Sequence, residues 1–230
     1  MRAALLNNLD HQALRLRPLT RHSAVAMPGA VPTVPAEFRL LQAHYPVLFQ
    51  AAGPSFQPVA LLGLEQGQNL FLNDKGWDAA HLPWALERQP LLVGRDGANA
   101  VVHIDLDHPL LSECEGEPLF LPHGGQAPLL EQRVAVLQAL HQGLEELPAF
   151  IEALCRLELL EPLHFDVDQP DGSVRRLSGY HGINEERLAA LPGSAVATLH
   201  EAGHWLPIAM ALASLGRLRD LVEREARQRG

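Results

Sequence analysis

Residues 56–93 constrain the fold more than any other part of the chain. Two short apolar runs, at residues 58–64 and 69–72, are separated by a polar segment that contains Gly67. This pattern predicts two antiparallel strands joined by a short loop. A second polar segment with a glycine, at residues 73–76, predicts a turn directly after them.

A short helix is predicted after this turn, at residues 82–89. Pro83 suits its first turn, where a helix makes no use of the amide hydrogen that proline lacks. Pro90 ends the helix, and the apolar run at residues 91–93 returns the chain to an extended conformation. The stretch therefore predicts strands and turns around one short helix.

Further extended runs surround this stretch and predict an antiparallel sheet over residues 14–108. A short helix is also expected at residues 36–44, because Phe38, Leu41 and Tyr45 fall on one of its faces. The predicted strands are 46–51 and 99–106, with 14–17 and 23–27 as candidate edge strands.

Helical periodicity dominates the C-terminal half, at residues 127–227. We expect one helix at 128–142 that Gly143 ends, a second that Pro148 opens, and a last helix that runs from Ser194 towards residue 227. A hairpin at 163–167 and 173–179 and a helix at 185–190, capped by Asn184, lie between them. The chain is therefore expected to be α+β, with a mainly antiparallel sheet in the N-terminal half, helices mostly from the C-terminal half, and a single domain over residues 1–230.

Charge and composition exclude several functional classes. A net charge of −9 argues against nucleic acid or an anionic membrane as the main partner, since both attract basic surfaces. No apolar run approaches the ~18 residues that span a bilayer, which excludes a permease. Without a signal peptide or a disulfide framework, Cys114 and Cys155 are expected to be reduced thiols of a cytoplasmic protein.

Three groups of residues resemble the SapC family of bacterial proteins. They are VALLGL, NLF and GWDAAHLPWALERQPLL within residues 59–92, EGEPLF at 115–120 and ASLGRLRDL at 213–221. The resemblance covers residues 14–221. It implies a role in surface-layer protein export or in outer-membrane, TonB-dependent uptake, and it supplies no reaction and no catalytic residues.

One motif has the spacing of a zinc site. His200, Glu201 and His204 fit H-E-x-x-H, which on one helix places two imidazoles on the same face and a carboxylate beside a metal-bound water. Glu223 or Glu225 is the candidate third ligand, but a continuous helix would carry it roughly 28 Å away. The alternative is a chance match among twelve histidines with no metal bound.

A second motif has the pattern of a non-haem iron site. His103 and Asp105 would share one face of a strand, as in the start of a facial triad, and His123 or His164 would have to complete it. The alternative is the polar outer face of a half-buried strand. The acidic loop at residues 113–117 could hold a cation or a basic peptide, or it is a solvated loop.

Two of the three tryptophans lie within the short helical piece and its entry turn. Trp77 is expected in the core. Trp84, with His81 and Arg88, is expected on one helical face that forms a recognition surface, and the alternative is that both rings are core.

Residues 205–215 are apolar on nearly every face, so they are expected in the core or at an interface, which leaves a homo-oligomer possible. Taken together, the sequence favours a soluble, non-catalytic SapC-like accessory protein that binds a peptide or protein and needs no cofactor. The alternatives are a zinc-dependent hydrolase and a non-haem iron oxygenase.

Overall fold

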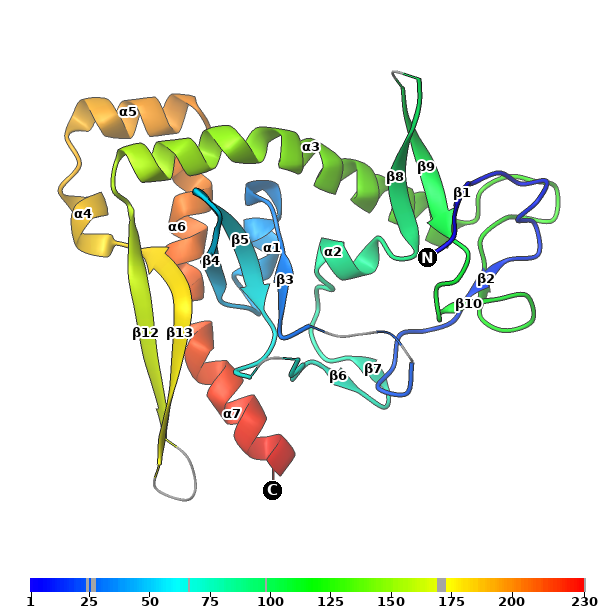
Figure 1. Cartoon of the computed structure of the whole chain (residues 1–230), viewed down its shortest axis with the longest axis horizontal. Helices are drawn as coiled ribbons and strands as arrows, with labels where there is room; N and C mark the ends of the chain where they lie inside the picture. The colour runs from blue at the N-terminus through cyan, green and yellow to red at the C-terminus, as the bar shows by residue number, and fades with distance from the viewer. Residues whose placement is uncertain (24, 26–27, 66, 98, 169–172, 230) are drawn as a thin grey trace. The chain divides into compact units, whose positions relative to one another are not determined.

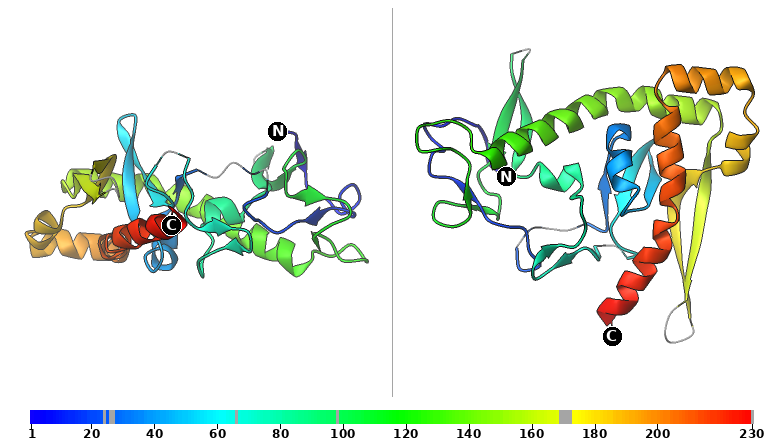
Figure 2. Two further views of the ribbon diagram at one scale, coloured as in Figure 1. Left: turned by 90° about the horizontal axis from the view of Figure 1, so that it is seen from below. Right: turned by 180° about the vertical axis from the view of Figure 1, so that it is seen from behind.

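The computed structural model describes residues 1–23, 25, 28–65, 67–97, 99–168 and 173–229 (Figures 1 and 2). It is α+β, with antiparallel strands mostly in the N-terminal half and the larger helices in the C-terminal half, as the sequence predicts. Contacts gather in two compact units. The first comprises residues Met1–Met27 and Phe71–Gln142, and the second comprises Pro28–Leu70 and Gly143–Gly230.

The first unit contains two three-stranded antiparallel sheets, a small hairpin and a short helix. Their orders are β1-β9-β8 and β10-β2-β11, and the hairpin joins β6 to β7. The elements are β1 (Ala3–Leu5), β2 (Arg15–Leu16), β6 (Leu72–Asn73), β7 (Gly76–Trp77), α2 (Trp84–Glu87), β8 (Leu91–Asp96), β9 (Asn99–Asp105), β10 (Leu111–Ser112) and β11 (Glu117–Pro118).

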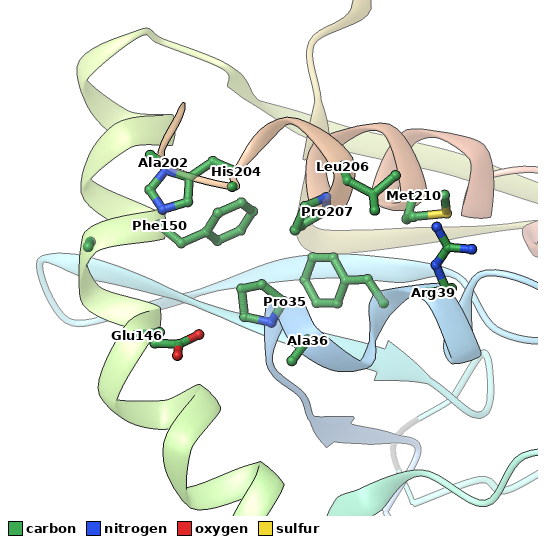
Figure 3. A pocket seen from close by; sticks show the side chains of 13 residues that line it. Pro35, Ala36, Arg39, Glu146, Phe150, Ala202, His204, Leu206, Pro207 and Met210 are labelled. Atoms are coloured by element: carbon green, nitrogen blue, oxygen red, sulfur yellow. The ribbon is translucent and has the colours of Figure 1, made fainter. Parts of the chain in front are cut away.

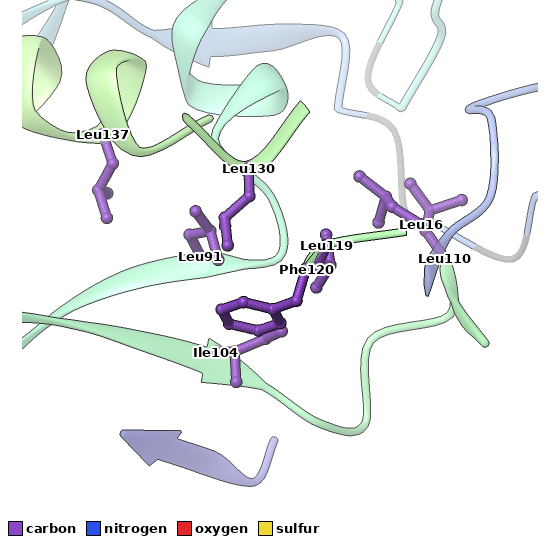
Figure 4. Close-up of a cluster of buried hydrophobic side chains, with 8 residues drawn as sticks. All are labelled: Leu16, Leu91, Ile104, Leu110, Leu119, Phe120, Leu130 and Leu137. Carbon is purple, nitrogen blue, oxygen red and sulfur yellow. The ribbon is translucent and has the colours of Figure 1, made fainter. Parts of the chain in front are cut away.

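Apolar side chains of the first unit form one cluster (Figure 4). Leu91 and Ile104 come from the neighbouring strands β8 and β9, and Leu130 comes from the start of the long helix α3 (Pro128–Arg156). All three are completely buried, so this cluster anchors the segment that carries α2.

The second unit is built on a five-stranded antiparallel sheet in the order β12-β13-β4-β5-β3. Phe38 lies in its core and packs edge-on against both Phe49, at 6.5 Å, and Phe150, at 6.0 Å between ring centroids. The strands are β3 (Ala30–Pro32), β4 (Val47–Ala52), β5 (Ser55–Leu61), β12 (Leu160–Asp168) and β13 (Val174–Ile183). The helices are η1 (Pro35–Glu37), α1 (Phe38–Leu41), α4 (Glu185–Ala189), α5 (Gly193–Glu201), α6 (Trp205–Ser214) and α7 (Arg217–Arg229).

Helix α3 passes through two residues that were expected to interrupt it. The predicted break at Gly143 is wrong, because the residue is glycine for a packing reason: a Cβ atom there would lie 2.5 Å from Cγ2 of Val34. Pro148 lies inside the same helix rather than opening a new one. Because proline has no amide hydrogen, the carbonyl of Leu144 loses its helical hydrogen-bond donor. The side chain of Leu144 is exposed, so this part of the helix lies at the surface.

The last helix is also different from the prediction, because it is three helices. Gly203, with a φ of 72°, separates α5 from α6, and Gly216 lies between α6 and α7. Ser194 is not a cap, since α5 begins at Gly193 with Pro192 as its N-cap. Asn184 does cap α4, as predicted, and accepts a hydrogen bond from the amide of Arg187 at 2.7 Å.

The prediction of a single antiparallel sheet over residues 14–108 is wrong, because the strands in this range belong to several separate sheets. Residues 58–64 and 69–72 do not form a hairpin. Strand β5 pairs with β4 and β3 instead, and the amide of Leu70 in the second run donates a hydrogen bond to the carbonyl of Leu62 in the first. Strand β2 lies between β10 and β11 rather than at an edge.

The predicted strands at 46–51 and 99–106, the helix at 36–44 and the hairpin of β12 with β13 are confirmed. The turn at residues 169–172 lies outside the described residues, as does most of the candidate strand at 23–27. No helix in the described part of the chain is long and apolar enough to cross a membrane.

Candidate functional site

The H-E-x-x-H residues do not lie on one helix. His200 and Glu201 are the last two residues of α5, whereas His204 follows the turn at Gly203 and is the N-cap of α6. The amide of His204 donates to the carbonyl of Leu199 at 2.8 Å, which closes the end of α5. The helical spacing that suggested a shared zinc is therefore not realised.

The carboxylates considered as a third zinc ligand have other partners. Glu225 is buried, and it accepts hydrogen bonds from Arg175 at 2.6 Å and from Gln68 at 2.8 Å. Glu223 lies 4.0 Å from Arg227, one turn further along α7. Among the residues that the structure describes, no group of three or more His, Cys, Asp or Glu side chains could hold a metal ion.

The candidate iron residues belong to β9, but each is packed into the local structure. The ring of His103 covers Gly94 of the neighbouring strand, where an added Cβ would lie 2.5 Å from the ring. Asp105 accepts hydrogen bonds from the amides of Arg2, at 3.0 Å, and Asp107, at 3.2 Å. His103 and Asp105 therefore have structural roles: the first packs on the neighbouring strand, and the second holds the main chain at the end of the sheet.

The acidic loop at residues 113–117 is exposed. Ser112 accepts hydrogen bonds from the amides of Cys114 and Glu115, both at 3.1 Å, and so shapes the turn. The carboxylate of Glu115 lies 4.0 Å from Arg17.

The two tryptophans around α2 are both half-buried. Trp77 stacks on the buried ring of Phe71, with centroids 5.8 Å apart, and its indole donates to the carbonyl of His81 at 3.1 Å. Exposure therefore does not separate Trp77 from Trp84. Leu86 is buried and packs α2 against the rest of the first unit.

The predicted recognition face of α2 is only partly assembled. His81 precedes the helix, so the helical spacing of His81, Trp84 and Arg88 is wrong for its first member. Arg88 caps the helix, and its guanidinium donates to the carbonyl of Leu91 at 2.7 Å. Burial lowers the pKa of Arg88, but an arginine with a lowered pKa stays charged at neutral pH.

A groove of about 490 Å³ lies in the second unit, where α6 and the turn before it face η1, α1 and α3 (Figure 3). Its floor includes Phe38 and Phe150, both buried. Its walls are mainly apolar, and they include Leu206, whose side chain is 46% exposed. The lining residues are Pro35, Ala36, Phe38, Arg39, Glu146, Ala149, Phe150, Ala202, Gly203, His204, Leu206, Pro207 and Met210.

The turn at Gly203 gives the groove its imidazole. By ending α5, it brings His204 against Phe150, with ring centroids 5.4 Å apart in an edge-on arrangement. Burial, and secondarily the charge of Arg156, lower the pKa of His204, so the imidazole is neutral at neutral pH. It can therefore donate or accept a hydrogen bond but adds no charge.

The charged groups of the groove are Arg39 and Glu146. They lie on opposite sides of Pro35 in Figure 3. Arg39 is exposed, and no other described residue forms an ion pair or a hydrogen bond with its side chain. The groove thus combines an aromatic floor with a cation at one end and a carboxylate at the other.

Sequence reasoning identified His204 for a different role and missed Arg39 and Glu146. The apolar run at residues 205–215 was the available signal. It predicted a helix buried on every face, but only part of α6 is covered, and Leu206 with Met210 forms a wall of the groove.

A protein-family model described as SapC matches residues 6–221 of the chain. No curated protein and no solved structure matches it.

Proposed function

The chain belongs to the SapC family, and we propose that it is a non-catalytic accessory protein that binds a peptide, or an extended segment of a partner protein. The family resemblance links this work to surface-layer export or to TonB-dependent uptake at the outer membrane. The observation that carries the proposal is the apolar groove of the second unit.

The groove suits a side chain of a peptide better than a small polar molecule. Its floor offers aromatic surface, and its charges lie at the ends. A large apolar side chain of a peptide would bury against Phe38 and Phe150, as anchors do in peptide-binding grooves. The neighbouring residues of the peptide would then meet the rim.

Charge complementarity defines the peptide further. Arg39 has no acidic partner among the described residues, so it favours a peptide with an acidic residue beside the apolar anchor. Glu146 disfavours an acidic residue at the other end. The peptide is therefore expected to bind in one direction.

The experiment is selection of short peptides from a displayed library on the purified protein. Ala149 is exposed and lines the groove, so Ala149→Trp fills the groove without touching the core. Ala197 is exposed on α5 and outside the groove, and Ala197→Trp is the matched control. Selected peptides should share an apolar anchor next to an acidic residue, bind the Ala197→Trp variant and fail to bind the Ala149→Trp variant.

Enrichment of the same peptides on the Ala149→Trp variant would contradict the proposal. So would a selection in which no sequence is enriched over the support alone.

We place this activity in the cytoplasm. Cys114 and Cys155 are both exposed and free, which fits a reducing compartment. The partner is a peptide or protein rather than nucleic acid, given the net charge of −9, and a second copy of the chain is a possible partner as well. Fractionation of producing cells tests the compartment, and recovery of the protein from the periplasm would contradict it.

A further inference from the structure

One edge of strand β13, in the second unit, is left without a neighbouring strand. β13 pairs with β12 along its length, but it pairs with β4 at only two positions, Tyr180 with Gln50 and His181 with Phe49. Among the residues that the structure describes, residues 174–179 therefore have no strand beside them on the β4 side. No main-chain hydrogen bond from another described segment reaches them either.

A β-bulge lies where the pairing with β4 stops. Two residues of β13, Ser178 and Gly179, lie opposite one residue of β12. Gly179 has a φ of 86°, which a bulge residue can require. Because a bulge bends its strand, residues 174–179 leave the line of the sheet at this point and keep one edge free.

A hollow of about 660 Å³ lies along this free edge. Arg176, Leu177 and Ser178 line it, together with residues 28–30 and 63–65. Neighbouring residues of a strand point to opposite faces of the sheet, so a hollow lined by both Arg176 and Leu177 reaches the edge of the strand. The space next to the unpaired main chain is therefore open to a ligand.

The outermost strands of the five-stranded sheet are protected against pairing with another chain, whereas this edge is not. β3 and β12 are the outermost strands, and they contain Pro32 and Pro162 respectively. Proline has no amide hydrogen to offer an added strand, and it commonly protects sheet edges. Residues 174–179 contain no proline.

Carboxylates outnumber arginines in the ion pairs around the hollow. Arg175 pairs with Glu65 and Glu225, and Arg176 pairs with Asp166. Glu65 lines the hollow, and its side chain is 50% exposed. A basic residue of a ligand would therefore be attracted to Glu65, and an acidic residue would be repelled.

We propose that an extended segment of a partner protein, with a basic residue, adds to residues 174–179 as a further strand. Its main chain would pair with the free edge of β13, which supplies affinity in strand addition, and its basic side chain would reach Glu65. At about 3.4 Å per residue, the edge offers pairing over roughly 20 Å. The hollow shares no lining residue with the groove and prefers the opposite charge, so this proposal does not rest on peptide binding in the groove.

The experiment is amide hydrogen exchange of the isotopically labelled full chain, followed by NMR. The probes are acetylated and amidated hexapeptides of valine and threonine in which one lysine is moved along the peptide. One control set has glutamate in place of lysine. The other has methylated main-chain nitrogens, which keep the side chains but donate no hydrogen bond.

Two variants test the location of the site. Ser178→Trp obstructs the hollow from an exposed position on β13. Ser194→Trp is the matched control, because Ser194 is exposed on α5 and lies outside the hollow.

At least one lysine peptide should slow the exchange of amides within residues 174–179. At a peptide concentration of about ten times its Kd, the exchange should slow by about tenfold. The Ser194→Trp variant should keep this protection and the Ser178→Trp variant should lose it. The glutamate peptides should bind at least about tenfold more weakly, and the methylated peptides should give no protection.

The proposal is overturned if no lysine peptide slows these amides, or if the Ser178→Trp variant is protected as well as the control. It is also overturned if the glutamate peptides bind as well as the lysine peptides, or if the methylated peptides do, since only side chains would then be recognised. Protection of residues 174–179 in the chain alone that disappears on dilution would overturn it too, because a second copy would then occupy the edge.

Discussion

Replacement of Gly143 by alanine tests why α3 continues where the sequence predicts a break. In an isolated helix, Gly→Ala stabilises by about 1 kcal/mol, because alanine has the highest helix propensity and glycine one of the lowest. In this chain the new Cβ would lie 2.5 Å from Cγ2 and 2.8 Å from Cβ of Val34, which is completely buried. Overpacking of this kind costs about 1–3 kcal/mol, so the net expectation is a loss of about 1 kcal/mol in the free energy of unfolding.

A double-mutant cycle isolates the contact between the two residues. In a Val34→Ala background both Cγ atoms are gone and only the 2.8 Å contact with Cβ remains, so Gly143→Ala should cost about 1 kcal/mol less there than in the wild type. Urea unfolding of the four proteins, followed by far-UV circular dichroism, supplies the free energies. If Gly143→Ala stabilises the wild-type chain, or if its effect is the same in both backgrounds, packing against Val34 is not the reason for the glycine.

Three further outcomes are expected. Trp77→Ala should lower the free energy of unfolding by about 3 kcal/mol, because its stacking and its indole hydrogen bond are lost, and Trp84→Ala should lower it less; equal losses in melting temperature would contradict this difference. Glu225→Ala should lower the free energy of unfolding, measured in urea, by about 3 kcal/mol, because it leaves Arg175 without its buried partner. A loss below about 1 kcal/mol would show that the pair contributes little to stability. Protein purified without added metal should hold far less than stoichiometric zinc or iron by mass spectrometry, and a stoichiometric metal that His200→Ala removes would contradict the non-catalytic proposal.

Local patterns in the sequence predicted the elements whose cause is local. The helix at residues 36–44, the hairpin of β12 with β13 and the cap at Asn184 follow from periodicity, turn chemistry and side-chain capping. Each depends on residues close together in the chain, so a single sequence contains the information.

The failures share a tertiary cause. Gly143 resembles a helix end in sequence, and only its distance to Val34 explains why the helix continues. The break at Gly203 depends on a left-handed conformation that the apolar pattern of the flanking helices does not reveal.

The groove could not be predicted for the same reason. Its walls come from residues 35–39, 146–150 and 202–210, which the fold of the second unit brings together. The sequence signalled only that residues 205–215 needed an apolar environment.

Site-specific photo-crosslinking in the producing cell tests the central claim most directly. A photoreactive phenylalanine derivative replaces Leu206, whose large exposed side chain already forms a wall of the groove, or Ala197, which lies outside it, and the adducts are identified by peptide mass spectrometry. Peptide binding in the groove predicts an adduct at position 206 with one defined segment that carries a large apolar residue next to an acidic one, and none at position 197. Equal labelling at both positions, or no adduct at position 206, would contradict it.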